Sequence, residues 1–331
     1  MNLVVLGAGA WGTALAISFS QRHRVTLWSR NESHLAELAT TRLNQRYLPG
    51  ASLPDSITVE TKLDVALANA DLSLITTSTT GLGATTALLC QQSPNLPLLW
   101  VCKGFDKDTG RLPHETVGHM IGPNSEIRIG VLSGPSFALE VAKGLPCALT
   151  LASNDLDFAR DMTERLNGPT LRIYSSDDLV GVELGGALKN VMAIAAGVCD
   201  GMQLGMNARA ALITRGLAEI VRLGVAMGGK PETFMGLTGL GDLVLTATGD
   251  LSRNRTVGMH LAQGKSLDAV LASLGHVAEG VNSAQTALAL AKKHAIDMPI
   301  TQAVNAVLFA NADPRETVQR LLSRDAKAES A

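Results

Sequence analysis

A lysine inside an apolar, small-residue segment is the first side chain that could do acid–base chemistry. Lys189 lies in VELGGALKNV (residues 182–191), a pattern that predicts a buried helix. Burial disfavours an ammonium group and lowers its pKa from about 10.4 toward neutrality, as a general acid or base requires. Gly185 and Gly186 are small enough to let another element come close. A structural ion pair explains the same stretch equally well.

Two later clusters could assist such a lysine. Asp242 stands in a glycine-flanked turn, GLGDL, where it could orient a lysine or accept a substrate hydroxyl; a turn or helix cap is the more common explanation. The run SRNR, from Ser252 to Arg255, precedes a predicted helix and combines a hydroxyl, guanidinium groups and an amide. This combination suits a phosphate, although a solvated charged cap is the alternative.

Two segments follow apolar runs that look like strands. Lys103 comes directly after one, and SGPSFA (residues 133–138) comes after the next. Ligands of α/β sheets bind at the carboxyl ends of the strands. We therefore expect Lys103 to bring a cation to the site, and Gly134 and Ser136 to offer backbone and hydroxyl groups there.

The sequence GAGAWG, from Gly7 to Gly12, follows the apolar run Leu3–Leu6 and opens a helical pattern. A GxGxxG motif alone is weak, but a strand before it and a helix after it are what a dinucleotide-binding turn requires. Gly7 permits the tight turn, Gly9 lets the backbone approach a pyrophosphate, and Gly12 lets the helix pack close to the sheet. An ordinary glycine-rich turn is the alternative.

The end of the second predicted strand bears on the choice of dinucleotide. Ser29, Arg30 and Asn31 stand where NAD-binding proteins usually place an Asp or Glu for the ribose 2′-hydroxyl. Because no carboxylate would repel a 2′-phosphate and Arg30 could bind one, NADP(H) is favoured. A solvated surface arginine, with Glu32 nearby, would leave NAD(H) possible as well.

The pattern of apolar residues predicts two domains that position these side chains. Short apolar runs alternating with helical patterns predict a Rossmann-type, parallel, doubly wound sheet over residues 1–177. Helical periodicity then predicts an all-α substrate-binding domain over 178–325, with Asp177 and Asp178 as N-cap candidates, and a disordered tail over 326–331. The predicted strands are Leu3–Leu6, Val25–Trp28, Ile57–Glu60, Leu72–Thr76, Leu98–Val101, Ile127–Leu132, Ala148–Ala152 and Leu171–Tyr174. The predicted helices include Thr13–Ser20, Ser33–Thr40, Thr80–Gln91, Val182–Cys199, Ala208–Met227, Arg255–Ala262, Ser283–His294, Ile300–Phe309 and Pro314–Leu322.

The composition supports a large core and excludes several classes. With 331 residues, 46% of them hydrophobic, the chain is long enough for two domains. A net charge of −2 gives no basic field for nucleic acid or an anionic membrane. The start of the chain leaves no room for a signal peptide before its first strand, and no long apolar run is uninterrupted, so we expect a cytoplasmic protein without integral membrane association. The four cysteines are widely spaced, so we expect them to be reduced core residues and to form neither disulfides nor a metal site. They are Cys90, Cys102, Cys147 and Cys199.

Taken together, these segments resemble the bacterial NAD(P)-dependent glycerol-3-phosphate dehydrogenase family. GAGAWGTALA, KGF, SGPSFALEVAKG, VELGGALKNVMAIAAG, NARAALITRGLAE, GLGDLVLT, SRNRTVG and AEGVNSA fall in the family's order and span about residues 1–310. The resemblance implies interconversion of dihydroxyacetone phosphate and sn-glycerol 3-phosphate, with NAD(P)H and NAD(P)+, for phospholipid synthesis. We also expect a homodimer, and apolar helices such as Ser283–His294 could form its interface.

The resemblance also implies roles for single residues. Lys189 matches the family's proton acceptor and donor, Lys103 the companion lysine that contacts substrate and cofactor, and Asp242 a third catalytic position. Lys189 and Asp242 also match substrate-binding positions. The remaining substrate positions are matched by Gly134, Ser136, Ser252, Arg253 and Asn254. Cofactor positions are matched by Ala10, Trp11, Arg30, Ala138, Arg253, Val277 and Glu279, and supporting contacts by Asn190 and Thr246.

The sequence departs from the family pattern at one position, and two alternative functions are left open. Thr77 stands where the family usually has a proline, in the loop expected beside the nicotinamide. A hydroxy-acid or sugar-acid dehydrogenase of the same architecture is an alternative, because SRNR does not by itself distinguish a carboxylate from a phosphate. A non-catalytic NADP(H)-sensing protein is another, which Lys189 and Asp242 argue against.

Overall fold

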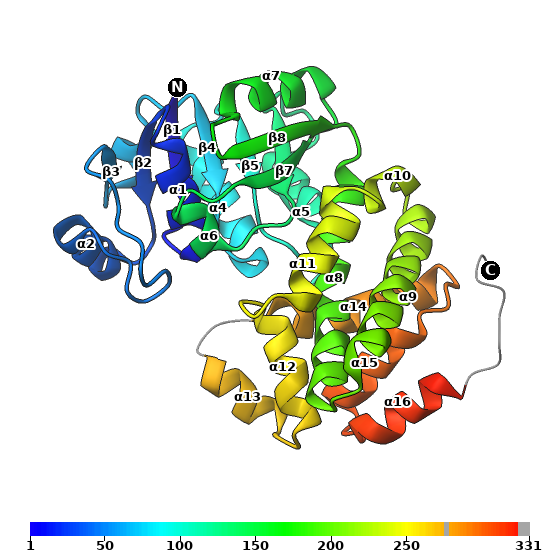
Figure 1. Cartoon of the computed structure of the whole chain (residues 1–331). Helices are drawn as coiled ribbons and strands as arrows, with labels where there is room; N and C mark the ends of the chain where they lie inside the picture. Colours follow the sequence, from blue (N-terminus) through cyan, green and yellow to red (C-terminus); the bar gives the residue numbers. More distant parts are fainter. Residues whose placement is uncertain (275–277, 324–331) are drawn as a thin grey trace.

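The computed structural model describes residues 1–274 and 278–323 of the chain. The predicted tail at 326–331 and Val277, expected to contact the cofactor, lie outside the described residues. Figure 1 shows an α/β part, coloured blue to green, from which the chain passes into helices coloured green to red. This arrangement confirms the predicted fold class, a Rossmann-type sheet followed by helices.

The sheet has eight strands in the order β3-β2-β1-β4-β5-β6-β7-β8. Strands β1 to β6 are parallel, as expected of short apolar runs that are buried on both faces. The strand order reverses between β1 and β4, and ligands bind at the carboxyl ends of strands beside such a switch point. The strands are β1 (Asn2–Leu6), β2 (Arg24–Trp28), β3 (Ile57–Val59), β4 (Leu72–Ile75), β5 (Leu98–Trp100), β6 (Ile129–Ser133), β7 (Cys147–Ala152) and β8 (Leu171–Ser176).

The last two strands depart from the predicted all-parallel arrangement. β7 pairs antiparallel with β6, and β8 then pairs parallel with β7. The connection after β6 carries only the short helix α6 (Ala138–Ala142), which shares an apolar cluster with the first half of α1 (Ala10–Phe19). A parallel β7 would need a connection long enough to carry the chain from the carboxyl end of β6 back to the edge of the sheet where β6 begins. The connection through α6 is too short for this, so β7 starts at the carboxyl end of β6 and runs antiparallel to it.

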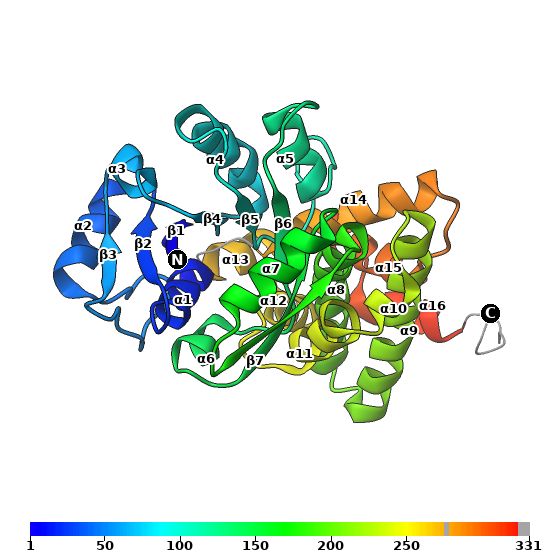
Figure 2. The same ribbon diagram turned by 90° about the horizontal axis from the view of Figure 1, so that it is seen from above.

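Helices cover both faces of the sheet. Figure 2 shows α4 and α5 on one side of the sheet and α1 and α6 on the other. The helices α3 and α6 are absent from the predicted elements because five residues are too few for a 3.6-residue period to show, whereas α5 and α7, also absent, have nine and eleven residues. The further helices of this part are α2 (Glu32–Thr41), α3 (Leu63–Leu67), α4 (Thr79–Gln92), α5 (Pro113–Ile121) and α7 (Leu156–Leu166).

One long helix joins the two parts. α8 (Leu179–Gly201) begins after Asp178, whose carboxylate accepts a hydrogen bond from Gly181 N–H at 2.8 Å and confirms the predicted N-cap. By length and composition α8 resembles a membrane span, but 94% of its apolar window is buried inside the protein, so it is a core helix. The elements that follow are α9 (Gly205–Ala226), α10 (Pro231–Phe234), the π-helix η1 (Leu237–Gly241), α11 (Asp242–Thr248), α12 (Arg253–Ala262), α13 (Leu267–Leu274), α14 (Glu279–Lys293), α15 (Pro299–Phe309) and α16 (Pro314–Leu322).

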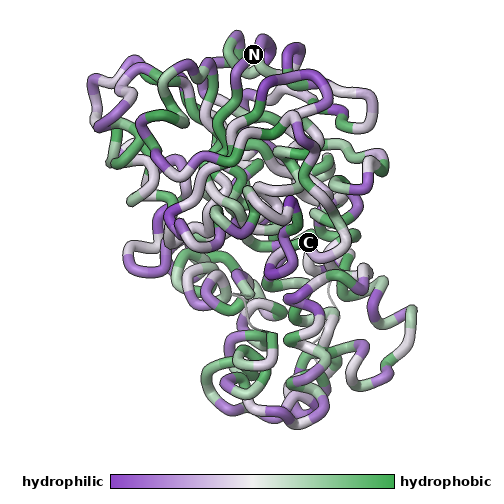
Figure 3. The backbone as a smooth tube through the Cα atoms, turned by 90° about the vertical axis from the view of Figure 1, so that its left-hand side faces the viewer, coloured by the Kyte–Doolittle hydropathy of each residue, from purple (hydrophilic) through white to green (hydrophobic). Residues whose placement is uncertain are grey.

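Two separate apolar clusters stabilise the two parts. One fills the sheet and its helices and ends at Val182, whereas the other surrounds α8 from Leu184 onward and also includes Phe105 and Leu112 of the α/β part. Figure 3 shows hydrophobic segments, in green, running through both parts. The segment expected at a dimer interface, Ser283–His294, forms the later part of α14 and its C-cap, and it turns Ala284 and Ala287 into the protein's own core. This apolar face is therefore not free for a partner.

All four cysteines are free thiols, as predicted. Cys102 and Cys199 are buried, but Cys90 and Cys147 are only half buried, so the prediction of core positions is wrong for these two. Cys147 donates its thiol hydrogen to Pro135 O at 3.3 Å, and burial raises its pKa to about 11. Cys147 is therefore a neutral thiol and a poor nucleophile.

Candidate active site

Three charged side chains from distant parts of the chain meet in one buried cluster. Asp242, the first residue of α11, accepts hydrogen bonds from Lys103 Nζ at 2.7 Å and from Lys189 Nζ. Lys103 follows β5 and also donates to Gly134 O at 2.8 Å. The side chains are 1% exposed for Asp242, 8% for Lys189 and 14% for Lys103. The fold thus brings together the three residues that the sequence analysis expects to be catalytic.

Burial and charge set the protonation states of this cluster. Burial, opposed by Asp242 and assisted by the charge of Lys103, lowers the pKa of Lys189 to about 8. Burial alone would raise the pKa of Asp242, but the ammonium groups of Lys103 and Lys189 outweigh it and hold this pKa below its usual range. Asp242 is therefore ionised at neutral pH, and Lys189 can exchange a proton close to that pH. The ion pair and the acid–base interpretation of Lys189 are compatible.

Small residues let the elements of the cluster approach one another. A Cβ at Gly185 would meet Thr238 O of η1 at 2.6 Å. A Cβ at Gly186 would meet Lys103 Cγ at 3.4 Å, so the lysine stem lies against α8. Gly185 therefore does what the sequence predicts, since a Cβ there would push α8 away from η1, and Gly186 leaves room for the Lys103 stem beside α8.

The start of α11 directs Asp242 into the cluster. No side chain among the described residues caps α11, so Asp242 is not the helix cap that its turn also suggested, and its carboxylate binds the two lysines. Thr246, one turn later, accepts from Lys189 Nζ at 2.7 Å and donates to Asp242 O at 2.7 Å. The supporting contact implied for Thr246 is therefore a hydrogen bond to Lys189.

The predicted phosphate-binding residues lie at the N-terminus of α12. Ser252 is its N-cap, and the Ser252 hydroxyl accepts from Arg255 N–H at 3.3 Å. Arg253 is exposed and forms no ion pair with any residue that the structure describes. The helix begins at Arg253, two residues before its predicted start, so the arginine is on the first turn. A helix N-terminus with a free guanidinium group is an arrangement that binds phosphate.

Asn254 joins this helix to its neighbours. Its Nδ2 donates to Asn190 Oδ1 on α8 at 2.9 Å, and its Oδ1 accepts from Gly280 N–H on α14 at 3.1 Å. A side-chain amide carries two donor hydrogens, and only one of them is used within the described part of the chain. Since Asn190 follows Lys189 directly, these bonds connect the N-terminal end of α12 to the lysine cluster.

An ion-pair network that the sequence analysis missed supports α12. Asp200, near the end of α8, accepts from Arg255 Nε at 2.6 Å and from Arg209 NH1 at 3.0 Å, and Arg255 also pairs with Asp250 at 3.0 Å. Arg255 is thus ion-paired within the protein, whereas Arg253 forms no ion pair among the described residues and its charge acts on Glu279 only from a distance. An acidic residue in the last turn of a helix opposes the helix dipole, so Asp200 was itself a signal of a nearby cation.

The segment after β6 lies where the sequence predicts. Gly134 has a φ of +142°, and its carbonyl accepts hydrogen bonds from Lys103 Nζ and, at 3.1 Å, from Ser136 Oγ. Ala138 begins α6 and belongs to the same apolar cluster as Trp11 of α1. The proposed substrate-side residues and the glycine-rich turn are therefore close to one another.

The GAGAWG turn has the geometry of a phosphate-binding loop. Gly7 has a φ of +135° and donates its N–H to Trp28 O at 2.7 Å, which ties the turn to β2. A Cβ at Gly12 would overlap the carbonyl oxygen of Gly7 and the hydroxyl of Thr76, so α1 packs as closely as predicted. At Gly9 a Cβ would meet nothing within 4 Å in the described part of the chain. This open side and the uncapped start of α1 fit a pyrophosphate.

The remaining cofactor candidates lie around this turn and the lysine cluster. Ala10 begins α1, and Arg30 is exposed two residues beyond β2. Glu279 begins α14, where burial raises its pKa against the opposing charges of Arg253 and the two lysines. Arg30 thus lies just after the carboxyl end of β2, the strand next to β1 in the sheet. Glu279 is close enough to Lys103 and Lys189 for their charges to act on its carboxyl group.

The loop after β4 contains one residue that the sequence analysis missed and one that it singled out. The Thr76 hydroxyl donates to Gly7 O at 2.8 Å and so supports the glycine-rich turn. The hydroxyl of Thr77 is buried without a hydrogen-bond partner in residues 1–274 and 278–323. It lies against Gly81 of α4, since a Cβ there would be 3.2 Å from Thr77 Oγ1.

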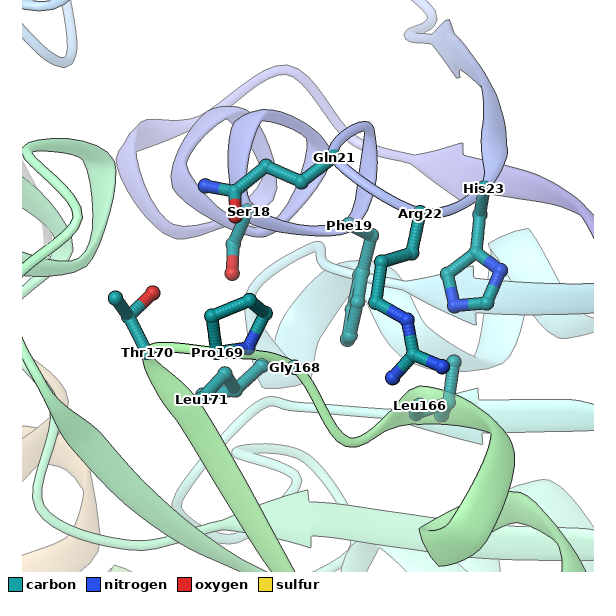
Figure 4. Close-up of a pocket in the computed structure, with 10 residues that line it drawn as sticks. All are labelled: Ser18, Phe19, Gln21, Arg22, His23, Leu166, Gly168, Pro169, Thr170 and Leu171. Carbon is teal, nitrogen blue, oxygen red and sulfur yellow. The ribbon is translucent and has the colours of Figure 1, made fainter.

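The surface also has a hollow elsewhere. Figure 4 shows it between the C-terminal end of α1, at Ser18 and Phe19, and the segment Gly168–Leu171 that leads into β8. None of the predicted site residues lines it. It lies one helix length from the glycine-rich turn and plays no part in the site.

Comparisons with known proteins agree with this site. The family description "NAD-dependent glycerol-3-phosphate dehydrogenase N-terminus" matches residues 2–159, and the corresponding C-terminus matches residues 178–319. The chain is 55% identical to the glycerol-3-phosphate dehydrogenase (NAD(P)+) of Aromatoleum aromaticum, over 99% of this chain and all of the relative. It is also 55% identical to the enzyme of that name from Thiobacillus denitrificans, with the same coverage.

A solved structure shows the same architecture. The glycerol-3-phosphate dehydrogenase of Coxiella burnetii superposes with a TM-score of 0.92 at 42% sequence identity, and the match covers 98% of this chain and 99% of that one. The likeness therefore includes both the sheet and the helices that carry the lysine cluster. The chain belongs to the NAD-dependent glycerol-3-phosphate dehydrogenase family.

Proposed function

We propose that this protein reduces dihydroxyacetone phosphate to sn-glycerol 3-phosphate with NADPH and one proton, and runs the reverse reaction with NADP+. As a member of its family it is an NAD(P)-dependent oxidoreductase. The observation that carries the proposal is the buried Lys189–Asp242–Lys103 cluster, joined through Asn190 and Asn254 to the N-terminus of α12. One end of this arrangement suits a proton transfer, and the other suits a phosphate.

Lys189 exchanges the proton. In the reductive direction its ammonium group protonates the oxygen on C2 as that oxygen gains negative charge, and in the oxidative direction the neutral amine removes the hydroxyl proton. A pKa of about 8 makes both forms accessible near neutral pH. Asp242 orients Lys189, and Lys103 places a second positive charge beside the substrate oxygens.

The substrate phosphate is held at the N-terminus of α12. Arg253 supplies the guanidinium group, Ser252 and Asn254 supply neutral donors, and the first backbone N–H groups of the helix add to the positive field. Gly134 and Ser136, beside Lys103, line the rest of the substrate. Asp200 supports this role because it engages Arg255 and leaves the charge of Arg253 available.

The dinucleotide is held by the turn from Gly7 to Gly12 and by the residues around it, and its reduced nicotinamide supplies the hydride for C2. Arg30 pairs with the 2′-phosphate of NADPH, so we propose that NADPH is preferred over NADH. The other contacts come from Ala10, Trp11, Lys103, Ala138, Arg253, Val277 and Glu279.

Three features of the molecule as a whole belong to the proposal. The chain divides between residues 177 and 178 into a cofactor-binding and a substrate-binding domain, in keeping with the two separate apolar clusters. The enzyme works in the cytoplasm without integral membrane association, where it supplies glycerol 3-phosphate for phospholipid synthesis. It forms a homodimer, which sedimentation at several concentrations would test.

The test follows NADPH absorbance with purified protein and dihydroxyacetone phosphate. We expect NADPH oxidation, slower use of NADH, and a kcat lowered roughly 10²- to 10⁴-fold in Lys189→Ala. The matched control is Lys230→Ala, which removes an exposed lysine paired with Asp177 and should leave kcat unchanged. Oxidation of neither cofactor by folded, NADPH-binding protein would refute the substrate assignment and favour a hydroxy acid. An unchanged kcat in Lys189→Ala would refute the proton transfer.

A further inference from the structure

We propose that Asn44 and His34 are positioning residues of the dinucleotide site. Both donate to the carbonyl oxygen of Ala8, at the centre of the glycine-rich turn, and so set the direction of the N–H group that follows it. The sequence analysis assigned neither residue a role. This inference rests on the proposed binding of the dinucleotide at the turn from Gly7 to Gly12.

Asn44 is buried and fully hydrogen-bonded. Its side chain is 1% exposed, and its Nδ2 donates to Ala8 O at 3.0 Å and to Thr13 Oγ1 at 2.7 Å. Its Oδ1 accepts from Tyr47 N–H at 3.2 Å. One amide thus joins the turn, the first turn of α1 and the loop after α2. A buried amide with every group satisfied is costly to replace, because each lost bond leaves a partner unpaired.

His34 approaches the same carbonyl from α2. Its Nε2 lies 3.3 Å from Ala8 O, and because a carbonyl oxygen only accepts, Nε2 carries the hydrogen. The ring packs edge-on against Tyr47, with 5.2 Å between ring centroids. Asn31, the N-cap of α2, accepts from His34 N–H at 3.0 Å and fixes the start of the helix. The ring is therefore held in place from two sides.

Two donors on one carbonyl control the peptide that follows. The described chain contains no cis peptide bond, so the Ala8 carbonyl and the Gly9 N–H point in opposite directions. With the carbonyl held toward Asn44 and His34, the Gly9 N–H is turned away from the protein interior. Gly9 is also a position where an added Cβ would meet no described atom within 4 Å. The turn therefore holds this N–H away from Asn44 and His34, and the open space beside Gly9 leaves room for a ligand.

The loop that carries Asn44 is itself anchored. Leu48 is buried with Ala14 of α1 and Val141 of α6, and Ala51 packs against the same cluster. The loop after α2 thus packs against α1 and α6, the helices that begin at Ala10 and Ala138. A shift of this loop would move the turn and both helix starts together, so its contacts act on the cofactor side of the site.

The test measures dissociation constants of NADPH and NADH for the cofactor-free protein by titration calorimetry. Asn44→Asp keeps the acceptor for Tyr47 N–H but removes both donors, and we expect it to raise both constants roughly 10- to 100-fold. His34→Phe keeps the ring against Tyr47 and removes one donor, with an expected rise of roughly threefold to tenfold. The matched control, Asn305→Asp, alters another buried amide, which donates to Ala284 O at 2.7 Å, and should leave both constants unchanged.

A positioning role has a signature that general destabilisation lacks. The ratio of the NADPH and NADH constants should stay within about twofold of wild type, as should kcat and the KM for dihydroxyacetone phosphate at saturating NADPH. Unchanged constants in folded Asn44→Asp, or in His34→Phe if Asn44→Asp does not fold, would overturn the inference. So would a changed NADPH/NADH ratio, since that is the effect expected of Arg30→Ala. A wild-type protein that binds neither cofactor would overturn the proposed function as well.

Discussion

Replacing Asp242 by asparagine should move the pH dependence of both reaction directions. Asp242 is 1% exposed and bonds to Lys103 and Lys189, so its charge is the counterion of two buried ammonium groups. Reduction requires the ammonium form of Lys189 and is lost as pH rises through its pKa of about 8; oxidation requires the amine and is lost as pH falls through the same value. Removing the negative charge lowers this pKa. The falling limb of the pH–rate profile for reduction and the rising limb of the profile for oxidation should therefore both move to lower pH.

The size of the movement follows from Coulomb's law. Two charges about 4 Å apart interact by about 4 kcal/mol at an effective dielectric constant of about 20, and 1.36 kcal/mol corresponds to one pH unit. The half-maximal points of both limbs should therefore move down by roughly one to three pH units. The free energy of unfolding should also fall, by about 3–5 kcal/mol, because two buried ammonium groups lose their partner.

The assay compares kcat in both directions between about pH 6 and about pH 9.5, at saturating substrates, for wild type and Asp242→Asn. Asp177→Asn is the matched control, because its ion pair with Lys230 is on the surface and should leave both limbs in place. The variant must first be shown to fold and to bind NADPH. Limbs that stay at the wild-type pH in such a protein would refute the assignment of Asp242 as the counterion that sets the protonation of Lys189.

Three other changes test other parts of the molecule. Arg253→Ala should raise the KM for dihydroxyacetone phosphate roughly 10- to 100-fold with a small effect on kcat; an unaltered KM would argue against phosphate binding there. Gly12→Ala should raise the dissociation constant of NADPH at least roughly tenfold, because its Cβ would overlap the Gly7 carbonyl; tight binding in titrations would contradict this. Burial raises the pKa of Glu219 from 4.5 to about 7. The free energy of unfolding, measured by denaturant titration, should therefore fall by about 3 kcal/mol as pH rises through this window. Glu219→Gln should abolish this dependence on pH.

The sequence by itself determined the features that depend on neighbouring residues. The glycines of GAGAWG, the N-cap at Asp178 and the period of each apolar run are local requirements of a tight turn, a helix start and a buried strand or helix. Each could be predicted because the physical cause lies within a few residues. The candidate catalytic residues could be named because lysine, arginine and aspartate are unusual in such apolar or glycine-rich surroundings.

Only the tertiary structure decided which of these residues meet. Lys103 and Lys189 are separated by 139 and 53 positions from Asp242, and their contact depends on how closely η1 and the segment after β5 approach α8. The antiparallel direction of β7 follows from the packing of α6 near α1, and the support of Ala8 by Asn44 follows from the path of the loop after α2. No local pattern encodes these contacts, because each depends on two segments that burial brings together.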